Sequence, residues 1–124
     1  MIEKRILVVD DEELIREVYK QTFELAGYSV EVIEGGEEAL EAMRKMPCQV
    51  LFLDLNLPGM SGADLCRQIR REWPTTIPYA VTGYASPLEL SDCRDAGFEH
   101  CFTKPVSLRV LIAAAEEAFK RLEN

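Results

Sequence analysis

The sequence predicts an α/β fold in which a parallel sheet is covered by helices on both faces. Short apolar runs, typical of buried strands, alternate five times with longer runs whose apolar residues recur at helical spacing. The chain of 124 residues is long enough to bury a core, and no repeat, low-complexity segment or linker divides it. We therefore expect a single domain over residues 1–124.

Five strands are expected from the apolar runs. The run "RILVV" is continuous and β-branched, as in a strand buried on both faces, whereas "SVEVI" alternates partly and is expected nearer an edge. The run "QVLFLDL" is the most hydrophobic and is therefore expected at the centre of the sheet. The fourth and fifth strands are expected at "IPYAVTG" and "HCFTK".

The first two helices follow from periodicity and from their stop signals. Leu14, Ile15 and Val18 begin a helical pattern, and we expect most of them to face the core until Gly27 ends the helix. The run "GGEEALEAMRKM" forms the second helix, which Pro47 follows.

The remaining helices have recognisable starts or core faces. The third buries apolar residues before Trp73, and the fourth and fifth begin at serines suited to N-capping. The residues that carry these predictions are Leu65, Cys66 and Ile69 in the third helix, Ser86 and Pro87 at the start of the fourth, and Ser107 at the start of the fifth.

Right-handed crossovers leave few topologies for five strand–helix units. The common one is the flavodoxin-like doubly wound sandwich with strand order 2-1-3-4-5. In that order the first and third strands are neighbours, and the chain reverses direction between them. Ligands bind at such a switch point, outside the carboxyl ends of the strands.

Composition excludes several functions. The net charge is -8, so direct nucleic-acid binding is not expected. The chain has neither an apolar run of about 20 residues, as a membrane span needs, nor a signal-peptide pattern, and we expect a cytoplasmic protein. The cysteines have no metal-binding spacing and are expected as reduced thiols, with His100 on the surface. These cysteines are Cys48, Cys66, Cys93 and Cys101.

Five polar residues fall at the carboxyl ends of the predicted strands. Asp10 and Asp11 follow the first strand, Asp54 the third, Thr82 ends the fourth and Lys104 ends the fifth. Acids at a helix start can simply cap it, but three acids meeting at one sheet edge repel one another, and a cation removes that conflict. Mg²⁺ suits oxygen ligands of this kind, and an aspartate can accept a phosphoryl group.

Four segments at these strand ends resemble one family. The segments "LVVDDE", "LFLDLNLPGMSG", "VTGY" and "FTKP" are together similar to the receiver domain of bacterial two-component response regulators, over essentially the whole chain. The resemblance implies a phosphoacceptor, an Mg²⁺ site, a switch hydroxyl, a phosphate-binding lysine and a cis peptide before Pro105. The phosphoacceptor would be Asp54, the switch hydroxyl that of Thr82 and the phosphate-binding lysine Lys104. The Mg²⁺ ligands would be Asp10, Asp11, Asp54 and the main-chain carbonyl of Asn56.

The resemblance also implies partners. A histidine kinase or phosphotransfer protein would donate the phosphoryl group, docking near the first helix, and a downstream protein or output domain would receive the signal. The family reads the signal out through the fourth helix, fifth strand and last helix, which is also one option for a homodimer. The alanines of "LIAAAEEAF" either let a partner approach closely or face the core. We expect no output domain within residues 1–124.

The sequence departs from the family pattern beside the predicted site. Cys101 stands where the family has a Tyr or Phe that turns inward on phosphorylation, and Phe102 should point to the opposite face because side chains alternate along a strand. Gly83 replaces a common alanine. Tyr84 either shades the phosphate from water or is an ordinary surface residue.

Other functions of this fold fit less well. A haloacid-dehalogenase-type phosphatase needs a second aspartate where the chain has Asn56, and a flavin-binding domain needs a phosphate-cradling loop where the chain has acids. A receiver that acts only as an interaction module is disfavoured by the five polar residues at the strand ends.

Overall fold

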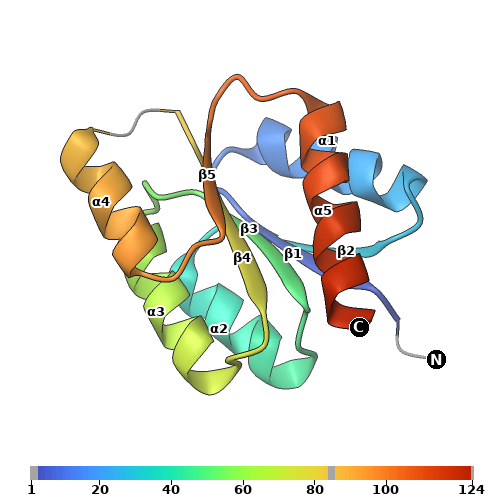
Figure 1. Ribbon diagram of the computed structural model, residues 1–124, viewed down its shortest axis with the longest axis horizontal. Coiled ribbons are helices and arrows are strands. Elements are labelled where there is room, and N and C mark those ends of the chain that lie inside the picture. The colour runs from blue at the N-terminus through green and yellow to red at the C-terminus, as the bar shows by residue number, and fades with distance from the viewer. Residues whose placement is uncertain (1–2, 84–85, 124) are drawn as a thin grey trace.

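The computed structural model describes residues 3–83 and 86–123. Five parallel strands lie in the order β2-β1-β3-β4-β5 and alternate with five helices (Figure 1), which confirms the predicted fold and strand order. The elements are β1 (Arg5–Val9), α1 (Glu13–Leu25), β2 (Ser29–Ile33), α2 (Gly36–Lys45), β3 (Val50–Leu53), α3 (Gly62–Glu72), β4 (Ile77–Thr82), α4 (Pro87–Asp95), β5 (His100–Thr103) and α5 (Leu108–Glu123).

The helices form two layers on either side of the sheet. Helices α1 and α5 cover one face, and α2, α3 and α4 cover the other (Figure 1). Each strand sends alternate side chains into two apolar clusters: Leu51 and Leu53 of β3 join the α2–α3–α4 side, whereas Val50 and Phe52 join the α1–α5 side.

Burial follows the strand order. Every residue of β3 and β4 is buried, as expected for strands with neighbours on both sides. Strand β2 has four half-buried residues and one exposed, which confirms its predicted place at an edge. Strand β3 lies third of five, so the prediction that it is central is also confirmed.

The buried face of α1 differs from the prediction. Tyr19 and Phe23 are its buried residues, and Phe23 stacks on Phe52 of β3 with ring centroids 4.9 Å apart. Leu14 is 69% exposed and Val18 36% exposed, so the expectation that most of the early apolar residues face the core was wrong. The helix carries two apolar stripes, and the stripe with the large aromatic rings is buried because it removes more area from water.

Serine side chains cap three helices. The caps at Ser86 and Ser107 were predicted, and the hydroxyl of Ser107 accepts from the main-chain N–H of Arg109 at 3.2 Å at the start of α5, whereas the cap at Ser61 was not predicted. Ser61 accepts a hydrogen bond from the main-chain N–H of Asp64 at the start of α3. Ser86 and Glu89 form a reciprocal capping box at the start of α4. Within the described residues, no helix is both long and apolar enough to cross a lipid bilayer.

Candidate functional site

Three aspartates meet at the carboxyl ends of β1 and β3. One carboxylate oxygen from each of Asp10, Asp11 and Asp54 lies within 4.8 Å of the other two. Asp10 and Asp54 are buried and Asp11 is exposed, so the cluster opens to solvent on one side. Parallel pairing of β1 with β3 brings the acids together, because Val9 pairs with Leu53 and the next residues leave the sheet side by side.

Asp10 is fixed at four points. Its main-chain N–H donates to the carbonyl oxygen of Ile33 at 3.1 Å, and its carbonyl oxygen accepts from the guanidinium of Arg16 at 2.9 Å. Its carboxylate accepts from the main-chain N–H of Glu12 at 2.9 Å and from the ammonium of Lys104 at 2.8 Å. The loop that also carries Asp11 is therefore held in place.

Asp54 is held through hydrogen bonds of both its main chain and its carboxylate. Its main-chain N–H donates to Val9, which extends the β1–β3 ladder, and one carboxylate oxygen accepts from the main-chain N–H of Asn56 at 3.0 Å. The other oxygen lies 3.4 Å from Nζ of Lys104. The first turn of α3 packs against its main chain at Gly62, whose N–H donates to Leu55.

Burial and charge act on this cluster in opposite directions. Burial raises the pKa of Asp54, and the nearby Asp10 carboxylate adds to the rise, although the Asn56 N–H and Lys104 oppose it. Burial works to lower the pKa of Lys104, but its bonds to Asp10 and its attraction to Asp54 outweigh burial and raise it. Lys104 is thus a charged ammonium that partly neutralises the two buried carboxylates.

Thr82 lies beside this cluster at the end of β4. It is fully buried, and its hydroxyl oxygen accepts a hydrogen bond from the side-chain amide of Asn56 at 3.0 Å. This bond links the loop after β3 to the end of β4. The Lys104–Pro105 peptide is cis.

Cys101 and Phe102 lie on opposite faces of the sheet. Cys101 packs against the cluster under α3 and α4, whereas Phe102 packs on the α1–α5 side, its ring 5.8 Å from that of Tyr79. Phe102 therefore cannot substitute for an aromatic ring at the Cys101 position.

The donor set of the acidic cluster fits a hard divalent cation. Three carboxylates with oxygen atoms within 4.8 Å of one another, two of them buried, present the oxygen ligands that Mg²⁺ prefers. The single ammonium of Lys104 leaves this group net negative, so a bound cation would relieve the remaining repulsion.

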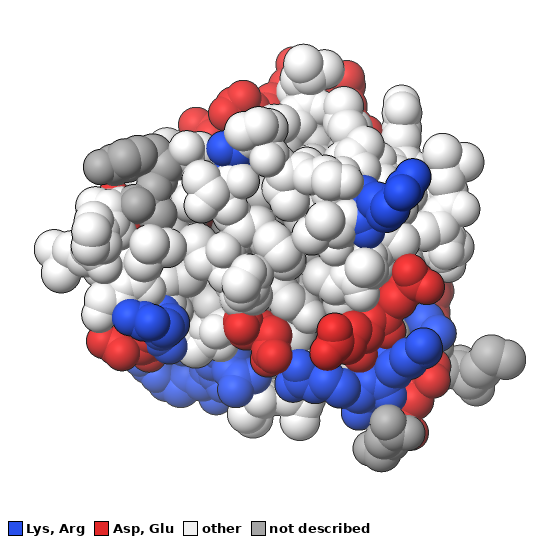
Figure 2. Space-filling view, turned by 45° about the horizontal axis from the view of Figure 1, so that its top comes forward, with Lys and Arg blue, Asp and Glu red and all other residues white. Residues whose placement is uncertain are grey.

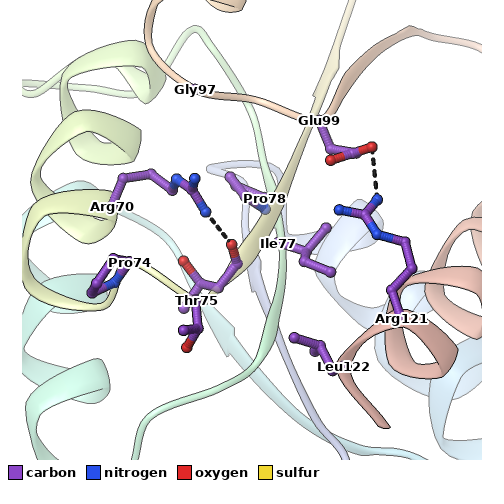
Figure 3. A pocket seen from close by; sticks show the side chains of 10 residues that line it. Arg70, Pro74, Thr75, Ile77, Pro78, Gly97, Glu99, Arg121 and Leu122 are labelled. Carbon is purple, nitrogen blue, oxygen red and sulfur yellow. Dashed lines mark hydrogen bonds and ion pairs between the residues drawn. The ribbon is translucent and has the colours of Figure 1, made fainter. Parts of the chain in front are cut away.

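A hollow lies at the opposite edge of the sheet. It has a volume of about 290 Å³ and is bordered by Arg70 and Arg121 (Figure 3). The guanidinium of Arg70 donates to the carbonyl oxygen of Thr76, and that of Arg121 pairs with Glu99 at 2.8 Å. Both arginines thus hold loops at the amino-terminal ends of β4 and β5.

The structure brings all five polar residues predicted at the strand ends to one edge of the sheet. Sequence reasoning missed Arg16 and the side-chain role of Asn56. Arg16 could have been found as a cation in the first turns of the helix that follows Asp10. His100 is exposed, as predicted. Tyr84 lies outside the described residues.

Comparison with known proteins agrees with this geometry. Residues 6–116 match the family described as the response regulator receiver domain. A response regulator, MprA, from Mycobacterium leprae is 33% identical over 117 residues, which cover 94% of this chain and 51% of the relative. A cyclic di-GMP phosphodiesterase from Thermotoga maritima is 33% identical over 106 residues, covering 86% of this chain and 28% of that protein. The chain thus spans about half the length of these relatives or less.

Solved structures give the same result. A CheY-like receiver domain protein from Methanospirillum hungatei superimposes with a TM-score of 0.94 at 32% identity, and 98% of each chain is covered. A chemotaxis protein, CheY4, from Vibrio cholerae superimposes with a TM-score of 0.88 at 27% identity, over 94% of this chain and 99% of that one. The chain belongs to the response regulator receiver domain family.

Proposed function

We propose that this receiver domain accepts a phosphoryl group on Asp54 from a phosphohistidine donor and thereby changes its affinity for a partner protein. The observation that carries this proposal is the cluster of Asp10, Asp11 and Asp54 with Lys104 bonded into it. It is a phosphoacceptor that promotes its own modification, not an enzyme that acts on a separate substrate.

The chain's own residues would position the reaction. The Asp54 oxygen that attacks forms a bond to phosphorus while the bond from phosphorus to the donor's imidazole nitrogen breaks, and the electron pair stays on that nitrogen. The Asn56 N–H holds the other Asp54 oxygen, which orients the carboxylate. Lys104 lies within reach to neutralise charge on the incoming phosphoryl oxygens.

Mg²⁺ is the cofactor that this site suits. Asp10, Asp11, Asp54 and the main-chain carbonyl of Asn56 would hold it. When bound, it neutralises negative charge on the phosphoryl oxygens.

Thr82 would respond to the phosphorylation of Asp54. The Thr82 hydroxyl now accepts a bond from the Asn56 amide, and because a hydroxyl can also donate, it would donate to a phosphoryl oxygen on Asp54 and be drawn toward it. Movement of Thr82 would shift the loop between β4 and α4 and bias a two-state equilibrium. The half-buried Cys101 leaves this domain without the aromatic ring that usually shares in that change.

Two surfaces would meet the partners. The exposed Leu14 and Val18 of α1 lie next to the acidic loop, where a histidine kinase or phosphotransfer protein would dock. The face formed by α4, β5 and α5 would bind the downstream target or a second copy. Figure 2 shows a broad uncharged stretch on this side, and the most exposed apolar residues of the two helices are Leu88 and Val110.

The alanines of α5 divide between the two roles left open by the sequence. Ala115 and Ala118 are fully buried in the core, whereas Ala113 is exposed and available to a partner.

In the longer relatives the matched segment is only part of the protein, and we propose that residues 1–124 form one receiver domain that carries no output domain itself.

The decisive experiment is intact mass after incubation with a small acyl phosphate, with and without Mg²⁺. We expect a Mg²⁺-dependent gain of one phosphoryl group on the wild type. Asp54→Asn should show no gain, whereas Asp64→Asn, which changes an exposed aspartate on α3, should behave as the wild type.

Two outcomes would contradict the proposal. A gain that persists in Asp54→Asn would place the phosphoryl group elsewhere. No gain in the wild type at any donor concentration would indicate a domain that binds partners without being phosphorylated.

A further inference from the structure

A large apolar hollow lies at the edge of the sheet opposite the acidic cluster. It has a volume of about 1060 Å³ and is bordered by the carboxyl-terminal ends of α3 and α5 and by the residues that precede β3 and β4. Cavities of this size hold small molecules in other proteins. Its apolar lining consists of Pro47, Cys48, Trp73, Pro74, Phe119 and Leu122.

The lining comes from both helix layers. Trp73 packs against the apolar cluster under α2, α3 and α4, whereas Phe119 belongs to the cluster under α1 and α5. Phe119 is buried, Trp73 is half-buried and Leu122 is 38% exposed, so the lining extends from the core to the surface. An apolar chain that entered here would remove this lining from water.

The hollow of about 290 Å³ between Arg70 and Arg121 adjoins the larger one. The residues that border both include Thr75, Thr76 and Arg121. In Figure 3 the guanidinium groups of Arg70 and Arg121 reach toward the middle of the smaller hollow from opposite sides. The apolar hollow therefore has a polar end with two cations.

Every carboxylate that borders the two hollows is already paired with a basic side chain. The pairs are Glu72 with Arg44 at 3.5 Å, Glu99 with Arg121 at 2.8 Å and Glu123 with Lys4 at 3.1 Å.

Arg70 differs from the other cations of the lining. Its guanidinium donates to the carbonyl oxygen of Thr76, and no carboxylate within residues 3–83 and 86–123 forms an ion pair with it. A guanidinium has five N–H donors, so Arg70 keeps donors for an anion. The polar end thus has one positive charge that the neighbouring acids do not compensate.

We propose that the two hollows together bind a small amphiphilic carboxylic acid, with its apolar chain between Trp73 and Phe119 and its carboxylate on Arg70. The apolar lining favours an aliphatic or aromatic body, and the single uncompensated guanidinium favours one negative charge. The site does not rest on the proposed function, because the residues that carry it lie at the opposite edge of the sheet from Asp54.

Arg70 would distinguish the acid from an uncharged molecule of the same length. A carboxylate can accept two hydrogen bonds from a guanidinium and is attracted by its charge, whereas an alcohol accepts a weaker neutral bond. We expect a difference in affinity of about tenfold, as for one hydrogen bond to a charged group. An alkylammonium ion of the same length should bind more weakly still, because Arg70 and Arg121 repel it.

Trp73 is the single tryptophan of the chain, so its fluorescence reports on this hollow directly. The test is to titrate the folded protein with octanoate, octanol and octylammonium while Trp73 emission is recorded. We expect octanoate to shift the emission to shorter wavelength and to bind about tenfold more tightly than octanol. Asp54→Asn should bind octanoate as the wild type does, which separates this test from the proposed function.

Matched substitutions separate the charge from the apolar lining. Arg70→Gln should bind octanoate no more tightly than octanol, whereas Arg70→Lys should keep most of the preference. Arg71→Gln removes the next charge on α3, which is exposed and outside the lining, and should behave as the wild type. Leu122→Ser should weaken both ligands severalfold, and Leu108→Ser, equally exposed at the other end of α5, should weaken neither.

Three outcomes would overturn the inference. The first is no effect of octanoate on Trp73 emission or on the nuclear magnetic resonance signal of the Trp73 indole N–H. The second is equal affinity of the wild type for octanoate and octanol. The third is equal loss of the preference in Arg70→Gln and Arg71→Gln, which would indicate a general attraction to surface charge. Far-ultraviolet circular dichroism confirms that each variant is folded.

Discussion

At the scale of single residues, the site depends on a close approach of main chains. Gly62 opens α3 directly against the main chain that carries Asp54. A Cβ at Gly62 would overlap the carbonyl oxygen of Asp54 and lie 2.7 Å from the Cα of Leu55, closer than side chains approach in folded proteins. Neither contact can be relieved by a rotamer change, so the position requires glycine.

Replacement of Gly62 by alanine should therefore destabilise the domain. We expect the free energy of unfolding to fall by about 1–3 kcal/mol, the usual cost of overpacking. Urea denaturation measures it. Gly83→Ala is the control, because no described atom lies within 4 Å of the added Cβ. Equal stability of Gly62→Ala and the wild type would show that α3 can shift freely away from Asp54.

The four cysteines should differ widely in reactivity. Burial raises the pKa of Cys48 to about 11 and that of Cys66 to about 12, whereas Cys101 is half-buried. Since the thiolate is the reactive form, iodoacetamide at pH 8 should modify Cys101 first and Cys48 only slowly, with the rate at Cys48 rising as the pH is raised. Peptide mapping at successive times measures this, and equal rates at the two cysteines would contradict it.

At the scale of elements, sequence patterns predicted each strand and helix but not always the face it buries. In α1, one apolar stripe contains Leu14 and Val18 and another contains Tyr19 and Phe23, and periodicity alone does not choose between them. The choice depends on Phe52 of β3, on which Phe23 stacks. Alternation along a strand has no such ambiguity, and it correctly placed Cys101 and Phe102 on opposite faces.

The candidate site was predictable for a similar reason. The carboxyl ends of parallel strands meet at one edge, so the positions of Asp10, Asp54, Thr82 and Lys104 after apolar runs were sufficient to group them. The bond between the Asn56 amide and Thr82 was not predictable, because it joins two loops whose paths no sequence pattern specifies.

Helix α4 should depend strongly on its N-terminal cap. Ser86 accepts from the Glu89 N–H, and Cys93 is the helix's one buried residue. Loss of the cap in Ser86→Ala costs about 1 kcal/mol, which corresponds to roughly fivefold faster local opening where 1.4 kcal/mol is tenfold. Amide hydrogen exchange in α4 measures this change.

The matched control keeps the cap. Ser86→Asp retains a side-chain oxygen acceptor and should exchange as the wild type does. If exchange in α4 were the same in Ser86→Ala, the helix would be held by contacts other than its cap.

The exposed apolar stripe of α1, which contains Leu14 and Val18, should affect the rate of phosphoryl transfer from a protein donor but not from a small-molecule donor. Leu14→Ser should slow phosphoryl transfer from a phosphorylated histidine phosphotransfer protein, yet leave modification by a small acyl phosphate unchanged. Its effect on stability should stay within about 0.5 kcal/mol because the side chain is 69% exposed.

Leu25→Ser is the control at the other end of the same helix, where the side chain is 90% exposed. The rate of phosphoryl transfer to each variant is measured by stopping the reaction at successive times and determining the intact mass. Equal slowing by Leu14→Ser and Leu25→Ser would place the docking surface elsewhere.

At the scale of the whole molecule, negative charge is concentrated at the acidic cluster, where a cation can bind. The net charge is -8, and the acidic cluster contains three carboxylates, two of which, Asp10 and Asp54, pair with the single ammonium of Lys104. Mg²⁺ should therefore stabilise the folded domain by about 2.7 kcal/mol at a concentration 100 times its Kd, as expected for a ligand that binds only the native state.

Thermal unfolding against Mg²⁺ concentration measures this gain. Asp11→Asn keeps the buried residues intact but removes one exposed carboxylate, and its unfolding temperature should respond much less to Mg²⁺. An identical response in both proteins would mean that the cation stabilises the domain from another place.

The strand order also has a consequence for how the domain forms during synthesis. Ile6 of β1 pairs with Val50 of β3, so the first strand must wait for a partner that the ribosome makes much later. Lys104 follows β5, which completes the far edge of the sheet. Asp10 and Asp54 follow strands that are made early, and the two buried carboxylates therefore gain their counter-charge only once β5 has joined the sheet.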